Sequence, residues 1–245
     1  MNLMLTISSE DNHLKVWNIY NFQCLLDLKE INENGWINSA CFLNDKNQIY
    51  VLSSNAIGFS KKPSPIKVYD LKGKLIKKIK DSNNNIYFID TYYDIKSSKT
   101  YIITGNACFS RSYDYNENEI YHNYNDEECT IVNNVIIFEK NLIESCMNGK
   151  IKIWDFHLNS LLHCIIAYKN YLNGLYSICL WNNNYLMAGA EDKSIKIIDL
   201  NKGVVIGQLE GHKTRVIMVR KFTHPKYGEF LVSQSYLDKG FKLWV

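Results

Sequence analysis

The residues whose types could take part in catalysis lie near the carboxyl end, where His212, Ser233, Ser235 and Asp238 fall within 27 residues. A serine, a histidine and a carboxylate are the components of a hydrolase triad, in which the histidine takes the serine proton. Neither serine lies in the GxSxG turn that exposes such a nucleophile, and no oxyanion loop accompanies it. The residue types alone therefore do not indicate a hydrolase.

Other catalytic and metal-binding patterns are missing from the sequence as well. The seven cysteines are widely separated, with no CxxC pair, and the six histidines do not supply zinc ligands at short spacing. The pair His163-Cys164 lies in an alternating strand pattern and is interpreted as packing. The sequence contains no GxxxxGK[ST], GxGxxG or HExxH motif. We therefore expect no enzymatic activity, no cofactor and no metal.

Length and composition favour a β domain inside the cell. The chain has 245 residues, of which 46% are apolar, so it can bury a substantial core as one large domain or two smaller ones. Few Pro and Gly residues together with 17 Tyr favour strands. The amino terminus is no secretory signal, and no apolar run is long enough to span a membrane. With cysteines expected to be reduced and buried, we expect a cytoplasmic protein, and a nuclear one is not excluded.

Short runs of alternating apolar and polar residues repeat along the chain, and each run contains an aromatic or apolar residue that we call its anchor. Such runs predict strands with one buried face. The anchors recur at intervals of 41 to 52 residues: Trp17, Tyr69, Tyr113, Trp154, Ile198 and Trp244. A polar residue precedes four of them by six positions: Asp11, Asn148, Asp192 and Asp238. A period near 40–45 residues is typical of a propeller built from four-stranded blades.

The last repeat carries the most specific pattern. Gly211-His212 precedes two strands separated by a turn, then Asp238 and a third strand that ends in Trp244. This pattern resembles one unit of a WD40-repeat β-propeller. The resemblance covers nearly the whole chain and implies an all-β fold of four-stranded antiparallel blades in a single domain, residues 1–245. About six blades are expected, with strands within 3–28, 36–79, 86–124, 131–167, 175–209 and 216–245.

The two end blades are predicted to be incomplete. The strands Leu3–Ser8, Leu14–Ile19 and Phe22–Leu28 match the second to fourth strands of a blade, so the first blade lacks its inner strand. The last blade lacks its outer strand. Three explanations remain open: a fragment or mis-started version of a longer, commonly seven-bladed propeller, closure through an irregular blade, or a strand supplied by a partner chain.

The resemblance also implies a buried hydrogen-bond network in each blade. A buried carboxylate is costly unless donors surround it. The full set is expected only in the last blade, from His212, Asp238, Trp244 and either Ser233 or Ser235. Asn148 replaces the aspartate in the fourth blade, and Ile198 replaces the aromatic anchor in the fifth.

Surface recognition is therefore the expected function. The resemblance implies a non-catalytic scaffold that binds a peptide or loop of a protein partner, within a larger complex, at the narrow face of the propeller. We expect neither a small-molecule substrate nor binding to nucleic acid or to a membrane. The family positions at this face carry over to Glu10, Trp36, Asn38, Asn85, Tyr87, Met147, Tyr176, Glu191, Arg215 and Leu237. Trp, Tyr and Arg are enriched at binding hot spots, although Trp36 and Tyr176 are alternatively partly buried residues at strand starts.

A second function class rests on charge. Lysines concentrate in the second blade: Lys61, Lys62, Lys72, Lys74, Lys77, Lys78 and Lys80. They predict either protection of an outer strand against edge pairing or a site for phosphoinositide or nucleic-acid phosphates. The phosphoinositide-binding propellers carry a double-arginine motif that this chain lacks, and the net charge of +3 requires no polyanionic partner.

Overall fold

The computed structural model describes residues 2–29, 36–56, 65–80, 85–168 and 174–244. Within these residues the chain forms strands and turns and no helix, so the predicted all-β class is confirmed. The strands make six antiparallel sheets, and in each sheet the strand order follows the chain. The fold is a six-bladed β-propeller.

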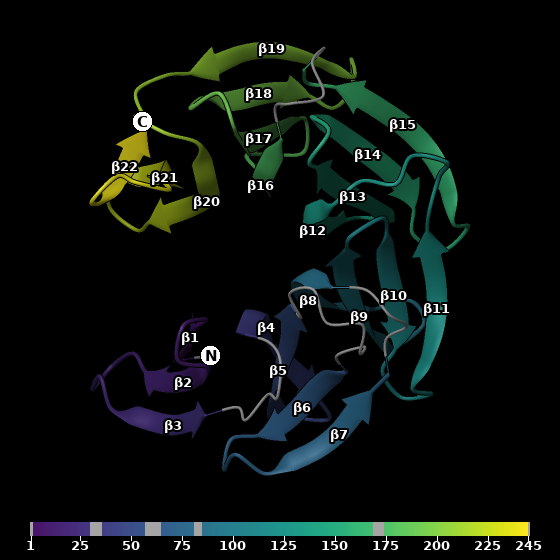
Figure 1. The fold of residues 1–245 in the computed structure, drawn as a ribbon, viewed down its shortest axis with the longest axis vertical. Helices are drawn as coiled ribbons and strands as arrows, with labels where there is room; N and C mark the ends of the chain where they lie inside the picture. The colour runs from purple at the N-terminus through teal and green to yellow at the C-terminus, as the bar shows by residue number, and fades with distance from the viewer. Residues whose placement is uncertain (1, 30–35, 57–64, 81–84, 169–173, 245) are drawn as a thin grey trace. The chain divides into compact units, whose positions relative to one another are not determined.

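The chain divides into two compact units, Met1–Asn123 and Tyr124–Val245, which are described separately. The expectation of one domain over residues 1–245 stays a prediction. The sheets of unit 1 consist of β1 (Leu3–Ser8), β2 (His13–Asn18) and β3 (Cys24–Lys29), of β4 (Trp36–Asp45), β5 (Gln48–Ala56), β6 (Ile66–Asp70) and β7 (Leu75–Ile79), and of β8 (Ile86–Asp94), β9 (Lys99–Asn106), β10 (Ser110–Asp114) and β11 (Glu119–Tyr124) (Figure 1).

Unit 2 contains the other three sheets, which we number as blades four to six in chain order. They consist of β12 (Val132–Phe138), β13 (Asn141–Cys146), β14 (Lys150–Asp155) and β15 (Ser160–Ile166), of β16 (Leu175–Leu180), β17 (Tyr185–Ala190), β18 (Ile195–Asp199) and β19 (Val204–Leu209), and of β20 (Val216–His224), β21 (Gly228–Ser235) and β22 (Phe241–Trp244).

The pairing register identifies the strand that the first blade lacks. In the last blade, Lys242 on β22 pairs with Ser233 on β21, and the Trp244 indole N–H donates to the Ser233 hydroxyl at 2.7 Å. In the first blade, Lys15 on β2 pairs with Thr6 on β1, and the Trp17 indole N–H donates to the Thr6 hydroxyl at 2.9 Å. Strand β1 therefore corresponds to β21, the second strand of its blade. The first sheet lacks the inner strand and the last sheet lacks the outer one in the described chain, as predicted.

The first strand of each of the other five blades carries a β-bulge at the same place. The register skips one residue on this strand: Asn38, Tyr87, Asn133, Tyr176 and Ile217. A bulged residue leaves the ladder and its side chain is re-aimed. Two of these side chains hold the following blade, since Asn38 donates to the Ile86 carbonyl at 3.1 Å and Asn133 donates to the Leu175 carbonyl at 2.8 Å.

A second link between blades comes from the residue after the bulge. The Asn134 side-chain oxygen accepts the Ile178 N–H at 3.0 Å. The hydroxyls of Ser39 and Ser177 accept the Ile89 and Val219 N–H groups at 3.2 and 3.3 Å. Because buried N–H groups need partners, these polar residues fix the register between first strands inside each unit.

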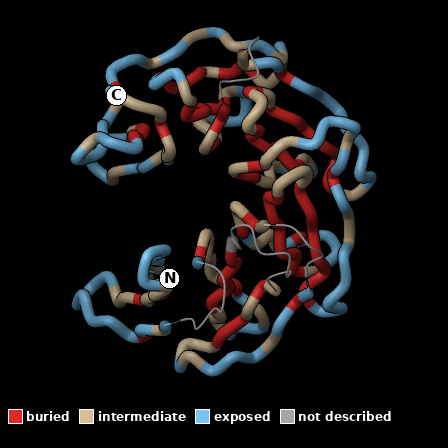
Figure 2. The backbone as a smooth tube through the Cα atoms, in the orientation of Figure 1, coloured by how far each residue is buried: buried red, intermediate tan, exposed pale blue. Residues whose placement is uncertain are grey.

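Burial follows the position of the strand within the blade. The third strands β10 and β14 are buried almost throughout, whereas the outer strands β3 and β15 are mostly exposed (Figure 2). Each unit has its own apolar clusters, one of them centred on Leu52 and Ile102 in unit 1 and another on Ile151 and Ile178 in unit 2. These sheets form the framework that positions the turn residues.

Candidate interaction surface

Tyr176 and Arg215, which are both predicted for the partner-binding face, lie close together in unit 2. Arg215 directly precedes β20, and its guanidinium carbon lies 5.5 Å from the ring centre of Tyr176, the bulged residue of β16. The ring centre of Tyr236 lies 4.3 Å from the same guanidinium carbon, and the Tyr236 N–H donates to the Arg215 carbonyl at 3.0 Å. The Arg215 Nε atom is buried and has no hydrogen-bond partner among the described residues. A guanidinium within about 6 Å of two aromatic ring centres is held in place by cation–π attraction to both.

Glu191 fixes one of these rings. The Tyr176 hydroxyl donates to the Glu191 carboxylate. Burial and this hydrogen bond raise the pKa of Tyr176 to about 12, so the phenol stays neutral and remains a donor. Glu191 is itself positioned by its backbone, since its N–H donates to the Gly174 carbonyl at 3.0 Å.

Met147 lies against Gly174, whose carbonyl accepts from Glu191, and Leu237 follows Tyr236 in the chain. A Cβ at Gly174 would lie 2.8 Å from the Met147 sulfur, so Gly174 admits the methionine side chain where a larger residue would displace it. The Leu237 N–H donates to the Thr214 hydroxyl at 3.1 Å, and the Leu237 side chain is 68% exposed. We call the whole set the Arg215 cluster: Met147, Tyr176, Glu191, Arg215, Tyr236 and Leu237. Tyr236 was not predicted, although its place between β21 and Leu237 marks it as a turn aromatic.

The five predicted residues of unit 1 are not brought together in this way. Trp36 begins β4 and is 45% exposed, and Glu10 is exposed in the turn between β1 and β2. Asn85 and Tyr87 are partly buried at the start of β8. Asn38 is engaged with the neighbouring blade through the Ile86 carbonyl.

The last blade contains the predicted hydrogen-bond network, and its serine is Ser233. The Trp244 indole donates to the Ser233 hydroxyl, which lies 2.6 Å from His212 Nε2, and His212 Nδ1 lies 2.7 Å from an Asp238 carboxylate oxygen. Hydrogen bonding from His212 holds the pKa of Asp238 below its usual value. Ser235 lies outside this chain of bonds, because its hydroxyl pairs with Thr214 at 2.5 Å.

This geometry gives the four groups a structural role. Ser233 is fully buried and His212 is buried, and the Ser233 hydroxyl is shared between an indole and an imidazole. Each donor in the chain finds an acceptor, which is the condition for a buried polar network to stabilise a fold.

The other two blades of unit 2 do not repeat this network in the described residues. In blade five, Asp192 accepts from the Ser194 hydroxyl at 2.6 Å and from Lys196 at 2.8 Å, and the Lys196 ammonium lies 4.7 Å from the Tyr168 ring centre. Burial raises the pKa of Asp192, but its hydrogen bonds with Lys196 and Ser194 outweigh that effect and bring the pKa below the usual value. In blade four, the Trp154 indole nitrogen is buried without a partner in the described chain.

A recurring basic residue was missed by the sequence reasoning. A Lys or Arg stands two residues before the anchor in every repeat: Lys15, Lys67, Arg111, Lys152, Lys196 and Lys242. The repeated pattern was visible in the sequence, but a lysine in an alternating strand does not show by itself what it pairs with. The structure supplies the partners, including Asp126 for Lys152 at 2.7 Å.

One lysine of the lysine-rich second blade is engaged by a residue of the third blade within unit 1. Lys77 donates to the Tyr115 carbonyl at 2.5 Å and lies 4.6 Å from the Tyr115 ring centre. Burial lowers the pKa of Lys77. Lys61 and Lys62 lie outside the described residues. The remaining lysines of this predicted patch lie on and around β7.

The expectation that all cysteines are reduced and buried is wrong. Cys108 and Cys129 are disulfide-bonded, and the free thiols of Cys24 and Cys164 are exposed. Disulfides persist mainly in oxidising compartments, so the cysteines no longer support a cytoplasmic location.

Comparison with protein-family models finds no family that matches the chain. No helix in the described residues has the length and hydropathy to cross a membrane. Among the same residues, no group of three or more His, Cys, Asp or Glu side chains is placed to hold a metal ion.

Proposed function

We propose that the chain is a propeller of the WD40-repeat type that acts as a non-catalytic protein–protein interaction scaffold. A propeller fold serves many functions, so the argument rests on the surface it presents. The repeats, the Trp244–Ser233–His212–Asp238 network and the turn residues of unit 2 support this proposal.

One observation carries the proposal: the guanidinium of Arg215 lies within cation–π distance of two tyrosine rings, and Leu237, which follows one of these tyrosines in the chain, is exposed. Aromatic rings and arginine are the groups that dominate binding energy at interfaces when a partner excludes water from them. Holding the arginine before binding reduces the entropy lost on association. Leu237 offers an apolar contact next to this charge.

The proposed mechanism is docking of a peptide or loop of the partner on the Arg215 cluster. A carboxylate of the partner pairs with Arg215, since Glu191 is engaged by Tyr176 and not by the arginine. An apolar side chain of the partner covers Leu237. In unit 1, the exposed Trp36 is the corresponding candidate anchor.

Affinity capture from native lysate with quantitative mass spectrometry tests this proposal. We expect Arg215→Ala and Leu237→Asp to lose the same set of captured proteins by about tenfold or more, with an unchanged melting temperature. Leu158→Asp is the matched control, because Leu158 is 75% exposed in the turn after β14 of the same unit. Identical capture by all three variants, or loss that accompanies a lower melting temperature, would contradict the assignment.

A further inference from the structure

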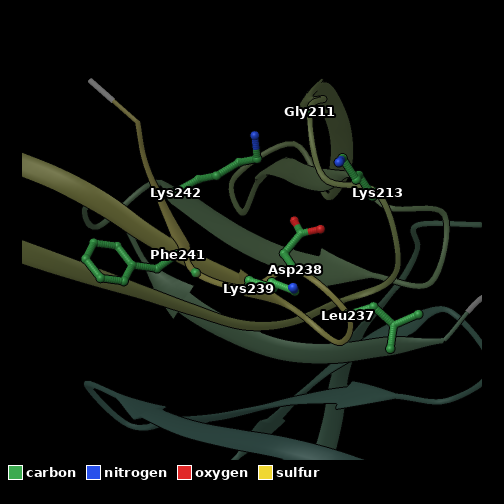
Figure 3. A pocket seen from close by; sticks show the side chains of 8 residues that line it. Gly211, Lys213, Leu237, Asp238, Lys239, Phe241 and Lys242 are labelled. Carbon is green, nitrogen blue, oxygen red and sulfur yellow. The ribbon is translucent and has the colours of Figure 1, made fainter.

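A pocket adjoins the Arg215 cluster in the last blade. Its volume is about 470 Å³, and its lining residues are Gly211, Lys213, Leu237, Asp238, Lys239, Gly240, Phe241 and Lys242 (Figure 3). They come from the segment that precedes β20, from the turn that joins β21 to β22, and from the start of β22. Leu237 belongs to both the pocket and the Arg215 cluster, so the two form one continuous surface.

The pocket carries an excess of positive charge. Lys213, Lys239 and Lys242 line it, and none of their ammonium groups has a hydrogen bond or ion pair with another described residue. The one carboxylate in the lining belongs to Asp238 and lies 2.7 Å from His212 Nδ1. Hydrogen bonding from His212 lowers the pKa of Asp238, and the charge of Lys242 acts in the same direction. Three lysines against one ionised aspartate leave two positive charges without a partner.

Two glycines leave room for a ligand in the pocket. A Cβ on Gly240 would have no atom within 4 Å apart from those of its chain neighbours. A Cβ on Gly211 would lie 3.7 Å from the Lys242 Nζ atom. The volume lies within the roughly 300–1,000 Å³ of ligand-binding pockets, so the space exceeds what one small ion needs.

Polar and apolar side chains are separated around this space. The Asp238 carboxylate points toward the side of the pocket that Lys213 and Lys242 line, whereas the Leu237 and Phe241 side chains point away from it (Figure 3). These two apolar side chains are 68% and 67% exposed. An anionic group can therefore enter the pocket while apolar groups beside it cover Leu237 and Phe241.

The charge and the volume together indicate two carboxylates as the occupant. One carboxylate would neutralise only one of the two excess charges, whereas complementary charge across an interface favours the correct partner and orientation. Lys213 and Arg215 are two residues apart, so their Cα atoms lie within about 7 Å of each other. The carboxylates that reach the pocket and the carboxylate that pairs with Arg215 therefore belong to one short segment.

We propose that the pocket binds a pair of Asp or Glu side chains from the same partner segment that docks on the Arg215 cluster. The inference rests on the proposed function and specifies its partner. The segment carries one acidic residue for Arg215, an apolar residue for Leu237, and an acidic pair for the pocket lysines. The lysines thereby fix the orientation of the segment on the surface.

Selection of short random peptides by the whole chain tests the proposal. We expect enrichment of peptides with an acidic pair next to an apolar residue, and saturable binding of the most enriched peptide in fluorescence anisotropy. Gly240→Glu and Lys239→Glu should each weaken this binding by about tenfold or more, because they place negative charge beside the acidic pair. Gly240→Gln is the neutral control for the first variant. Lys226→Glu, in the exposed turn between β20 and β21, is the charge-matched control for the second.

Exchange of the charges completes the test. A peptide whose acidic pair is replaced by two lysines should bind the Lys213→Glu, Lys239→Glu double variant better than it binds the unchanged chain. Enriched peptides that need Arg215 but lack the acidic pair, equal binding by Gly240→Glu and Gly240→Gln, or preference for a phosphorylated residue over the pair would overturn the inference and leave the scaffold function standing. Enriched peptides that depend on neither Arg215 nor Leu237 would overturn the proposed function and this inference together.

Discussion

At the residue scale, the same side-chain types serve different purposes according to their burial. His212, Ser233 and Asp238 have the composition of a catalytic triad, yet they form a chain of hydrogen bonds that begins at the Trp244 indole. Because Ser233 is fully buried, its hydroxyl satisfies two neighbours at once. Arg215 is different, since two tyrosine rings hold it beside an exposed leucine.

We predict that Ser233→Ala lowers the free energy of unfolding by about 1–3 kcal/mol, because it leaves the Trp244 indole N–H without an acceptor in a buried place. Ser160→Ala, at an exposed position of β15, should change it by less than about 0.5 kcal/mol. Urea unfolding of both variants measures the difference. Equal stabilities would argue against the network.

At the scale of elements, adjacent blades within a unit are joined by hydrogen bonds between the side chains of one first strand and the backbone of the next. The bulge in each first strand frees one side chain, and the next residue receives an N–H from the following blade. Asn134, Ser39 and Ser177 therefore act as acceptors, and substitution of any of them by an apolar residue would remove the acceptor.

We predict that Asn134→Ala makes the Ile178 amide exchange with solvent faster, because that N–H loses its acceptor. Asn133→Ala, one residue earlier, removes a donor to the Leu175 carbonyl and should leave the Ile178 amide protected. Hydrogen exchange followed by NMR reads each amide. The same protection of Ile178 in both variants would reject the proposed link between blades four and five.

At the scale of the whole molecule, charge separates the two function classes that the sequence left open. The net charge is only +3, and Lys77 of the lysine-rich blade is bound to the Tyr115 carbonyl. A phosphate-binding surface needs several free cations, because each neutralised phosphate releases counterions and makes binding fall steeply with salt.

We predict that capture of the protein partner changes by less than about threefold between about 50 mM and about 200 mM salt, whereas binding to a phosphate polymer over this range falls by about 10³- to 10⁵-fold for six to ten contacts. Titration of a captured partner against the purified chain provides the measurement. A steep salt dependence that Lys74→Ala and Lys78→Ala reduce together would favour the phosphate alternative.

The fold class, the six repeats and the incomplete end blades could be predicted from the sequence, because alternation with period two and anchors at regular spacing are local properties. It also predicted that His212, Asp238 and Trp244 form a network, but not which serine joins them. Ser233 and Ser235 lie on the same strand, and only the tertiary structure shows that Ser233 meets His212 while Ser235 meets Thr214. The Arg215–Tyr236 pair and the disulfide-bonded cysteines likewise depend on contacts between residues distant in the sequence. Such contacts depend on bulges, turns and neighbouring strands, which leave no periodic signal along the chain.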